Sequence, residues 1–408
     1  MAALQGVKPR ALQATLIKIT ETLAGELACP TRTSPDWSDF EWLIARAVAA
    51  MHGVSPLLSR ALHWQGPAGW VDFLEEQRAH TSSRHARIDE LLLGIDRLTR
   101  EQGVAAMALK GAALHSLGLY AGGERPMADV DLLVRAQDAE RAAQLIESLG
   151  FRESHTNWKE RVFTPVDDRA AASLGEHADN NIKIELHERI CEGLPRQMAD
   201  VSDLLFPPRP QPGLNAYPSR AALMIHLLLH AAGAMVIQSL RLIQLHDVAL
   251  LAARMQAADW DEVLEYRSKQ PLWWALPPLQ LTARYYYSST VPVPILRALK
   301  LDCPWHLERV YRRRKLSDVS YSHLWVDAFP GIEWSRSVPE MLKYTVSRVR
   351  PNAKLIALRN MDAKTQTWAS TDEWSRLSQT RRILRWVISR PTRPVTMHVV
   401  RAALAHAL

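Results

Sequence analysis

The sequence predicts an α+β protein, in which a small sheet-forming unit is embedded in a mostly helical chain of 408 residues. Apolar residues recur at helical spacing before residue 100 and again after residue 219, most clearly from Ser83 to Gln102. Between these two regions, Asp129 to Val134 and Asn181 to His187 have the composition and spacing of strands. The fold class follows from this change of pattern along the chain.

The first hundred residues are expected to be helical. The N-terminus, from Met1 to about Gly25, has the pattern of an amphipathic helix. Gly53 interrupts the apolar spacing of the next helical stretch, and Gly103 ends the last one. The helices expected after the N-terminal one are Asp39 to Met51, Val54 to Leu62 and Ser83 to Gln102.

A small α/β unit is expected from about residue 104 to residue 190. Short apolar or alternating runs lie there between helical patterns, and glycine-containing turns separate them. We expect strands at Val104 to Leu109, Asp129 to Val134, Arg161 to Thr164 and Asn181 to His187, and helices at Ala112 to Leu119 and Ala136 to Leu149.

Composition divides the chain into four parts. These are an N-terminal helical region at 1–100, an α/β core at 101–205, a proline-rich linker at 206–218 and a C-terminal helical region at 219–408. The linker holds five of the chain's 24 prolines, which make a connection stiff and extended. The stretch from about Asp362 onward is expected to be a loosely attached helical tail.

Bulk composition excludes several classes of protein. With 47% hydrophobic and 23% charged residues, the chain is globular and not disordered. Its three cysteines are far apart and form no CxxC motif, so we expect neither a disulfide framework nor a structural zinc site. No apolar run reaches the ~20 residues of a membrane-spanning helix, and the N-terminus is too polar for a signal peptide. We therefore expect a cytoplasmic protein without a membrane span.

The formal net charge of +7 suits a ligand that carries phosphate, but the basic residues are spread along the chain. The densest basic run, Arg312 to Lys315, is short and is more typical of a solvated helix face than of a binding stripe. Nucleic acid is therefore not expected as a partner.

Asp129 and Asp131 form the central feature of the sequence. Residues i and i+2 of a strand point to the same face, so the two carboxylates are expected side by side. Glu185 lies on the polar face of another expected strand and would supply a third carboxylate if the two strands are neighbours. Carboxylates at this range repel one another, and a bound cation such as Mg²⁺ offsets that repulsion. The alternative is that the two aspartates are ordinary turn and edge-strand residues.

Four more residues are candidates for the same site. Lys110 and Gly111 end the first expected strand, where a positive charge and a close backbone approach would suit a phosphate. Arg125 lies on the loop that leads into Asp129 and could contact a phosphate. His187 shares the face of Glu185 and could orient that carboxylate. An ordinary turn, a surface arginine and a sheet-surface histidine are the respective alternatives.

These motifs resemble a known family. The strings are Leu109-Lys110-Gly111, Arg125 to Val134 (RPMADVDLLV), Leu149-Gly150-Phe151 and Ile184 to His187. Together they are similar to the bacterial uncharacterised nucleotidyltransferase family, which is placed in the DNA polymerase β-like nucleotidyltransferase superfamily. The resemblance covers roughly residues 80 to 255.

The resemblance implies a mixed sheet packed by helices, two Mg²⁺ ions (or Mn²⁺ in their place) and a nucleoside triphosphate, with ATP as the expected donor. Asp129, Asp131 and Glu185 take the metal-ligand places of the superfamily, and Lys110, Gly111 and Arg125 would bind the nucleotide. The implied reaction moves a nucleoside monophosphate to an unidentified acceptor, either a small molecule, a peptide or a protein, and releases pyrophosphate.

Three features depart from the pattern of the superfamily and its families. Ala112 follows Gly111, where the superfamily has serine or glycine, and the interval from Gly111 to Asp129 is longer than usual. Glu185 also stands where relatives often have aspartate. The missing hydroxyl and the basic, tryptophan-rich C-terminal half leave open a non-catalytic nucleotide-binding or regulatory module.

A third reading is a helical metal-dependent phosphohydrolase. His226 and His230 are four residues apart and share a helix face, and His246 and Asp247 follow on another expected helix. Imidazoles with an aspartate suit a transition metal. Transition-metal content after purification would separate this reading from the other two.

Overall fold

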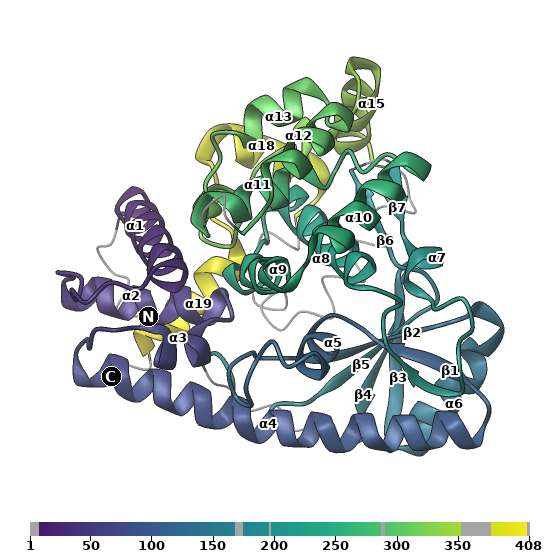
Figure 1. Ribbon diagram of the computed structural model, residues 1–408. Coiled ribbons are helices and arrows are strands. Elements are labelled where there is room, and N and C mark those ends of the chain that lie inside the picture. The colour runs from purple at the N-terminus through teal and green to yellow at the C-terminus, as the bar shows by residue number, and fades with distance from the viewer. Residues whose placement is uncertain (1–7, 168–173, 196, 287–289, 352–376, 406–408) are drawn as a thin grey trace.

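A six-stranded mixed sheet lies among helices in the computed structural model of the chain (Figure 1), which describes residues 8–167, 174–195, 197–286, 290–351 and 377–405. The α+β class and the mostly helical character predicted from the sequence are confirmed. The strand order is β3-β4-β5-β2-β1-β8, and a separate hairpin pairs β6 with β7. The strands are β1 Ala105–Ala108, β2 Asp129–Val134, β3 Phe151–Thr156, β4 Glu160–Pro165, β5 Lys183–His187, β6 Cys191–Leu194, β7 Gln197–Asp200 and β8 Gly213–Asn215.

Helices make up most of the remaining described chain. Those of the first hundred residues and of the sheet unit are α1 Pro9–Ala28, α2 Asp39–Met51, α3 Ser55–Ala61, α4 Ala68–Glu101, α5 Lys110–Ser116, α6 Ala139–Ser148 and α7 Ser202–Leu205. Those that follow are α8 Arg220–Val236, α9 Leu242–Arg254, α10 Ala257–Lys269, α11 Leu276–Tyr285, α12 Val293–Asp302, α13 Trp305–Tyr311, α14 Leu316–Val319, α15 Val338–Val349, α18 Gln379–Ser389 and α19 Pro394–Ala405.

The centre of the sheet joins strands that are far apart in the sequence. β2 runs parallel to β5 and antiparallel to β1, so the two expected acidic strands are neighbours. β8 pairs parallel with β1, through Ala105 to Met107 and Gly213 to Asn215. The proline-rich segment at 206–218, expected to be a linker, therefore supplies the edge strand of the main sheet.

The two faces of the sheet are covered differently. One face buries Val130, Leu132 and Ile184 against α4 and α6, in a core of its own. α4 runs along this face in Figure 1, and its C-terminus ends at a turn in which Gly103 has a φ of 66°. The opposite face, with Leu133, belongs to a larger core that also contains α8 and α9. Alternate residues of β2, Asp129 and Asp131, belong to this second face.

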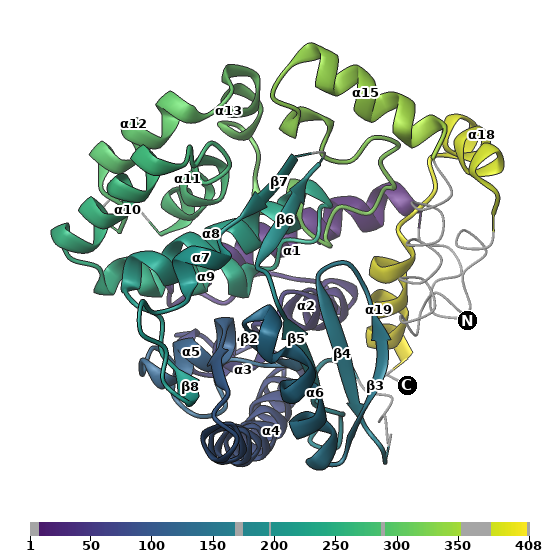
Figure 2. The same ribbon diagram turned by 90° about the vertical axis from the view of Figure 1, so that its right-hand side faces the viewer.

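The larger core draws together both ends of the described chain. α19 packs on α2, and Val400 and Ala403 are fully buried there, although the stretch beyond about Asp362 was expected to be a loosely attached tail. That expectation is wrong for α19, because this helix packs on α2 and buries its side chains from Val400 to Leu404 on one side. Figure 2 shows α19, in yellow, near the C-terminus of the described chain. Its part at 362–376 lies outside the described residues. Among the described helices, none combines the length and the apolar composition needed to cross a bilayer.

Candidate metal and nucleotide site

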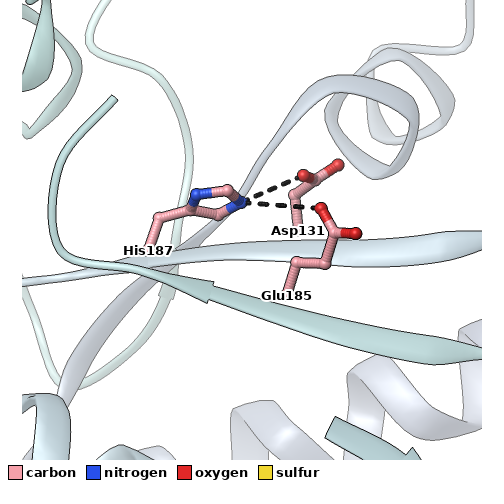
Figure 3. A group of neighbouring side chains, drawn as sticks. All are labelled: Asp131, Glu185 and His187. Carbon is pink, nitrogen blue, oxygen red and sulfur yellow. Dashed lines mark hydrogen bonds and ion pairs between the residues drawn. The ribbon is translucent and has the colours of Figure 1, made fainter. Parts of the chain in front are cut away.

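Two neighbouring strands bring the candidate carboxylates together. β2 and β5 are parallel, and their register places Asp131 directly beside Glu185 and Asp129 beside Lys183. Val130 and Leu132 point to the opposite, buried face, so the alternation of the strand directs Asp131 toward the side of α5, α8 and α9. Figure 3 shows Asp131 and Glu185 projecting from adjacent strands toward the same point.

His187 completes a compact group with these two carboxylates. Its Nε2 lies 3.1 Å from Asp131 Oδ1 and 4.0 Å from Glu185 Oε2 (Figure 3). One ligand atom from each of the three residues falls within 4.8 Å of the others, and no second group of this kind occurs among the described residues. On its other side, His187 Nδ1 lies 3.7 Å from Glu160 Oε2 on β4. The imidazole therefore sits between three carboxylates.

Asp129 lies on the same face but outside this group. It is half-buried, and its charge contributes to raising the pKa of Glu185, which places it near the group without making it a member. Burial and the charge of Asp131 raise the pKa of Asp129 itself, against the opposing charge of Lys110. A D-x-D pair on one strand thus has one carboxylate in the compact group and one beside it.

The carboxyl groups of the site outnumber the cations beside them, so they oppose one another's ionisation. Burial raises the pKa of Glu185 to about 9, and the charges of Asp129, Asp131 and Glu160 add to that rise. Burial also opposes ionisation of Asp131, but Lys110 and His187 more than compensate and hold its pKa well below the usual range. Carboxylates in such surplus fit a divalent cation, which removes the repulsion between them.

Lys110 supplies the nearest positive charge. Its Nζ lies 2.6 Å from Asp131 Oδ1, with the lysine side chain 20% exposed and the aspartate side chain 6% exposed. Burial lowers the pKa of Lys110, but the charges of Asp131, Glu185 and Asp129 outweigh burial and raise it above the usual value. The backbone of Lys110 has a φ of 45°, a left-handed conformation that is costly for a residue with a side chain.

Arg125 is held by a different partner. Its Nε and Nη2 donate to the two carboxylate oxygens of Asp247 at 2.8 and 2.7 Å, and Tyr120 Oη donates to Asp247 Oδ1 at 2.7 Å. The guanidinium is therefore committed to α9. The position of this guanidinium also explains why residue 111 is a glycine. A Cβ at that position would meet Arg125 Nη1 and would come 2.7 Å from Met127 Sδ. Gly111 allows the turn before α5 to approach the Arg125 side chain.

Tyr217 contacts the turn at Lys110, although no sequence pattern marks it as a site residue. The Tyr217 hydroxyl accepts a hydrogen bond from the Lys110 N–H at 3.4 Å and lies 2.7 Å from His226 Nδ1. Burial lowers the pKa of His226 to about 3, so the imidazole is neutral and can accept from the tyrosine. Tyr217 lies in the proline-rich segment, where neither periodicity nor spacing marks it. Only the pairing of β8 with β1 brings it beside Lys110.

The histidines considered for a hydrolase centre serve separate contacts. His226 pairs with Tyr217, and His246 Nδ1 lies 3.0 Å from the Tyr286 hydroxyl. Asp247 binds Arg125. Within the described part of the chain, these side chains form no common metal-binding group. The geometry therefore gives the phosphohydrolase reading no support.

The family model described as "Uncharacterised nucleotidyltransferase" matches residues 38–284, more than half of the chain. The chain belongs to the uncharacterised nucleotidyltransferase family. No curated protein and no solved structure matches it.

The nucleotidyltransferase family match covers the whole main sheet and extends through α8 and α9 to α11. It begins at Ser38, the N-cap of α2, whose hydroxyl accepts from the Glu41 N–H. The match is therefore wider than the range 80 to 255 inferred from the motifs. It includes the helices that hold Arg125 and Tyr217 as well as the carboxylate strands.

Proposed function

We propose that the protein transfers a nucleoside monophosphate from a nucleoside triphosphate, with ATP as the expected donor, to an acceptor, and releases pyrophosphate. Membership of a nucleotidyltransferase family supports the general activity. The observation that carries the proposal is the side-by-side register of Asp131 and Glu185 on parallel strands, with His187 beside both carboxylates. Acidic residues in this arrangement are difficult to explain by folding alone, because each raises the cost of ionising the others.

Asp129, Asp131 and Glu185 would hold the metal, for which we propose two Mg²⁺ ions, or Mn²⁺ in their place. Carboxylate oxygens are the ligands that Mg²⁺ prefers, and they also suit Mn²⁺. A divalent ion here supplies charge neutralisation for the triphosphate and activation of the attacking group. The raised pKa of Glu185 is the feature of this chain that fits such an ion, because a divalent cation would allow this carboxyl group to ionise beside Asp129 and Asp131.

The other side chains have roles that their contacts support. His187 Nε2 contacts Asp131 Oδ1 at 3.1 Å, so His187 would orient this proposed metal ligand. Lys110 keeps Asp131 ionised and has the charge to bind a phosphate oxygen. Gly111 belongs to the proposed nucleotide-binding turn. Arg125 holds that turn in place through its packing on Gly111, which supports a positioning role for this residue.

For the acceptor, we propose a small molecule, a peptide or a protein. Ala112, which replaces the superfamily's serine or glycine, lines a pocket of about 450 Å³ together with Ala113, Tyr217 and Leu223. This pocket adjoins the Lys110–Gly111 turn through Tyr217, whose hydroxyl contacts the Lys110 N–H. Its wall is mostly apolar, as is usual for small-molecule sites.

A transfer assay with labelled ATP and Mg²⁺ over fractionated lysate tests the proposal. Wild type should label an acceptor, and Asp131→Asn should reduce labelling at least about 100-fold, the scale of losing one group that stabilises transition-state charge. Asp89→Asn is the matched control, because this carboxylate is 60% exposed on α4 and should leave labelling unchanged. Equal labelling by wild type and Asp131→Asn would exclude the proposed site. Metal-dependent ATP binding without labelling would favour a non-catalytic module.

A further inference from the structure

The helices α15 and α18 expose apolar side chains to an unusual extent. Eight of the 18 large apolar side chains that are exposed in the described part of the chain lie on these two helices. The two helices are in contact and lie at the periphery of the molecule (Figure 2). Single exposed apolar residues are common on soluble proteins, but a cluster marks a surface that binds another component. The eight residues are Val338, Leu342, Val346 and Val349 of α15 and Ile383, Leu384, Val387 and Ile388 of α18.

The exposed apolar residues of α15 form one stripe. The four follow one another at intervals of four, four and three residues, which places them on a single face of the helix. Tyr344 lies on the other side of α15, where it is buried, and its Oη donates to the Pro330 carbonyl at 2.6 Å. This contact fixes the inner side of α15, so the apolar stripe faces outward, with Leu342 62% exposed.

A tryptophan attaches α18 in the same way. Trp386 Nε1 donates to the Val326 carbonyl at 3.0 Å and ties this helix to the rest of the chain. Leu384 and Ile388 are four residues apart on another side of the helix and are 59% and 75% exposed. None of the residues of α18 is buried, so the helix lies on the protein and adds little to its core.

A groove joins the two apolar stripes. It has a volume of about 210 Å³ and is lined by Val349 of α15 and by Ile383 and Val387 of α18. The exposed apolar side chains of both helices therefore form one continuous surface, which we call the two-helix surface.

The part of the chain that carries the two-helix surface is strongly basic. From residue 338 to residue 393 there are 12 lysines and arginines but only four acidic residues, so this stretch accounts for the whole net charge of +7. Basic residues occur throughout the chain, but elsewhere acidic residues offset them. The helix α18 itself has three arginines and no acidic residue. Arg350, which follows the stripe of α15, and Arg381 and Arg390, which flank that of α18, are all exposed.

We propose that the two-helix surface binds the anionic surface of a lipid bilayer, with α15 and α18 lying in the interface. A helix with one apolar face and arginines on its polar side is typical of proteins that lie in the plane of this interface. Anionic headgroups supply the negative charge that the basic excess attracts, and acyl chains accept the valine, leucine and isoleucine side chains. A nucleic acid would match the charge but would leave the apolar stripes in water. The proposal concerns where the protein acts and does not depend on the proposed nucleotidyl transfer.

Co-sedimentation of the full chain with lipid vesicles tests this proposal. The protein should bind vesicles made of equal parts of phosphatidylcholine and phosphatidylglycerol, and should bind pure phosphatidylcholine vesicles at least about 10-fold more weakly. Its affinity for the mixed vesicles should fall as the salt concentration rises, because salt screens the attraction between arginines and headgroups.

A pair of glutamate substitutions tests the apolar part of the surface. In Leu384→Glu/Ile388→Glu, two apolar side chains no longer enter the bilayer, so partitioning into the mixed vesicles should fall at least about 10-fold. The matched control is Leu93→Glu/Leu301→Glu, which adds the same charge at positions that are 71% and 80% exposed on α4 and α12. This control should bind as wild type does.

Several results would overturn the proposal. A wild-type protein that stays in the supernatant with the mixed vesicles contradicts it, and so does equal binding to both kinds of vesicle, because the basic residues would then have no role. Equal binding by Leu384→Glu/Ile388→Glu and the control would place the contact elsewhere. A wild-type dimer that binds no vesicles, and that this variant converts to a monomer, would show that a second copy of the chain covers the surface. If the variant does not fold, Leu342→Glu/Val346→Glu tests the same surface from α15.

Discussion

Removal of the Arg125 guanidinium should destabilise the fold itself. The side chains of Arg125 and Asp247 are 9% and 3% exposed, and two hydrogen bonds join them. Arg125→Met keeps most of the stem and removes the charge, so Asp247 would remain buried with only the Tyr120 hydroxyl as a partner. The loss of one partner from a buried ion pair costs about 3–5 kcal/mol. We expect the free energy of unfolding to fall by that amount.

Chemical denaturation followed by tryptophan fluorescence measures this change, since the chain has 14 tryptophans. Arg189→Met is a matched control, because Arg189 is 67% exposed and pairs at the surface with Asp200, which is 29% exposed, and such an ion pair contributes about 1 kcal/mol or less. The double variant Arg125→Met/Asp247→Leu should recover part of the loss, since it leaves no buried charge. The reasoning is refuted if Arg125→Met unfolds like Arg189→Met but no longer binds Mg²⁺-ATP, because Arg125 would then be a ligand contact.

Two further predictions concern the packing around Gly111 and the burial of His52. Gly111→Ala should lower the free energy of unfolding by about 1–3 kcal/mol, the usual cost of overpacking, because its Cβ would meet Arg125. In Gly122→Ala the nearest atom would be 3.9 Å away, so it is the control, and equal unfolding midpoints would contradict the prediction. Burial, and to a smaller extent the charge of Arg241, lowers the pKa of His52 from 6.5 to about 3 in the folded protein. Between these two pH values, the imidazole therefore binds a proton in the unfolded chain but not in the folded one. Stability should therefore be complete above pH 6.5 and fall by up to about 1.4 kcal/mol per unit between pH 6.5 and 3, with a shallower slope in His52→Gln.

Strong local patterns made much of the fold predictable. Asp39–Met51 and Asp129–Val134 have the limits that the sequence predicts, because their apolar spacing and flanking residues agree. The neighbouring positions of the acidic strands were a condition of the metal hypothesis, and the pairing of β2 with β5 confirms that condition. The roles of Asp129, Asp131 and Glu185 in chemistry remain predictions. A D-x-D spacing shows that two side chains share a face, but it does not show what binds them.

Long-range pairing accounts for what the sequence did not predict. β8 has only three residues in a proline-rich segment, and it is a strand because β1 has a free edge there. α4 begins at Ala68, well before the periodic stretch from Ser83, because its N-terminal turns pack on α3. The commitment of Arg125 to Asp247 joins residues 122 positions apart. Such contacts depend on the tertiary structure and leave no local pattern.

The turn at Lys110 and Gly111 shows why the site needs more than the sheet. Tyr217, held by His226 of α8, accepts from the Lys110 N–H, and this contact helps to hold a backbone with a φ of 45°. On the other side, Asp247 of α9 holds the Arg125 guanidinium against Gly111. Both supports come from the helices after residue 219, and the family match includes them. The α/β core at 101–205 alone would lack these supports, so the unit that presents Lys110 to Asp131 extends through α9.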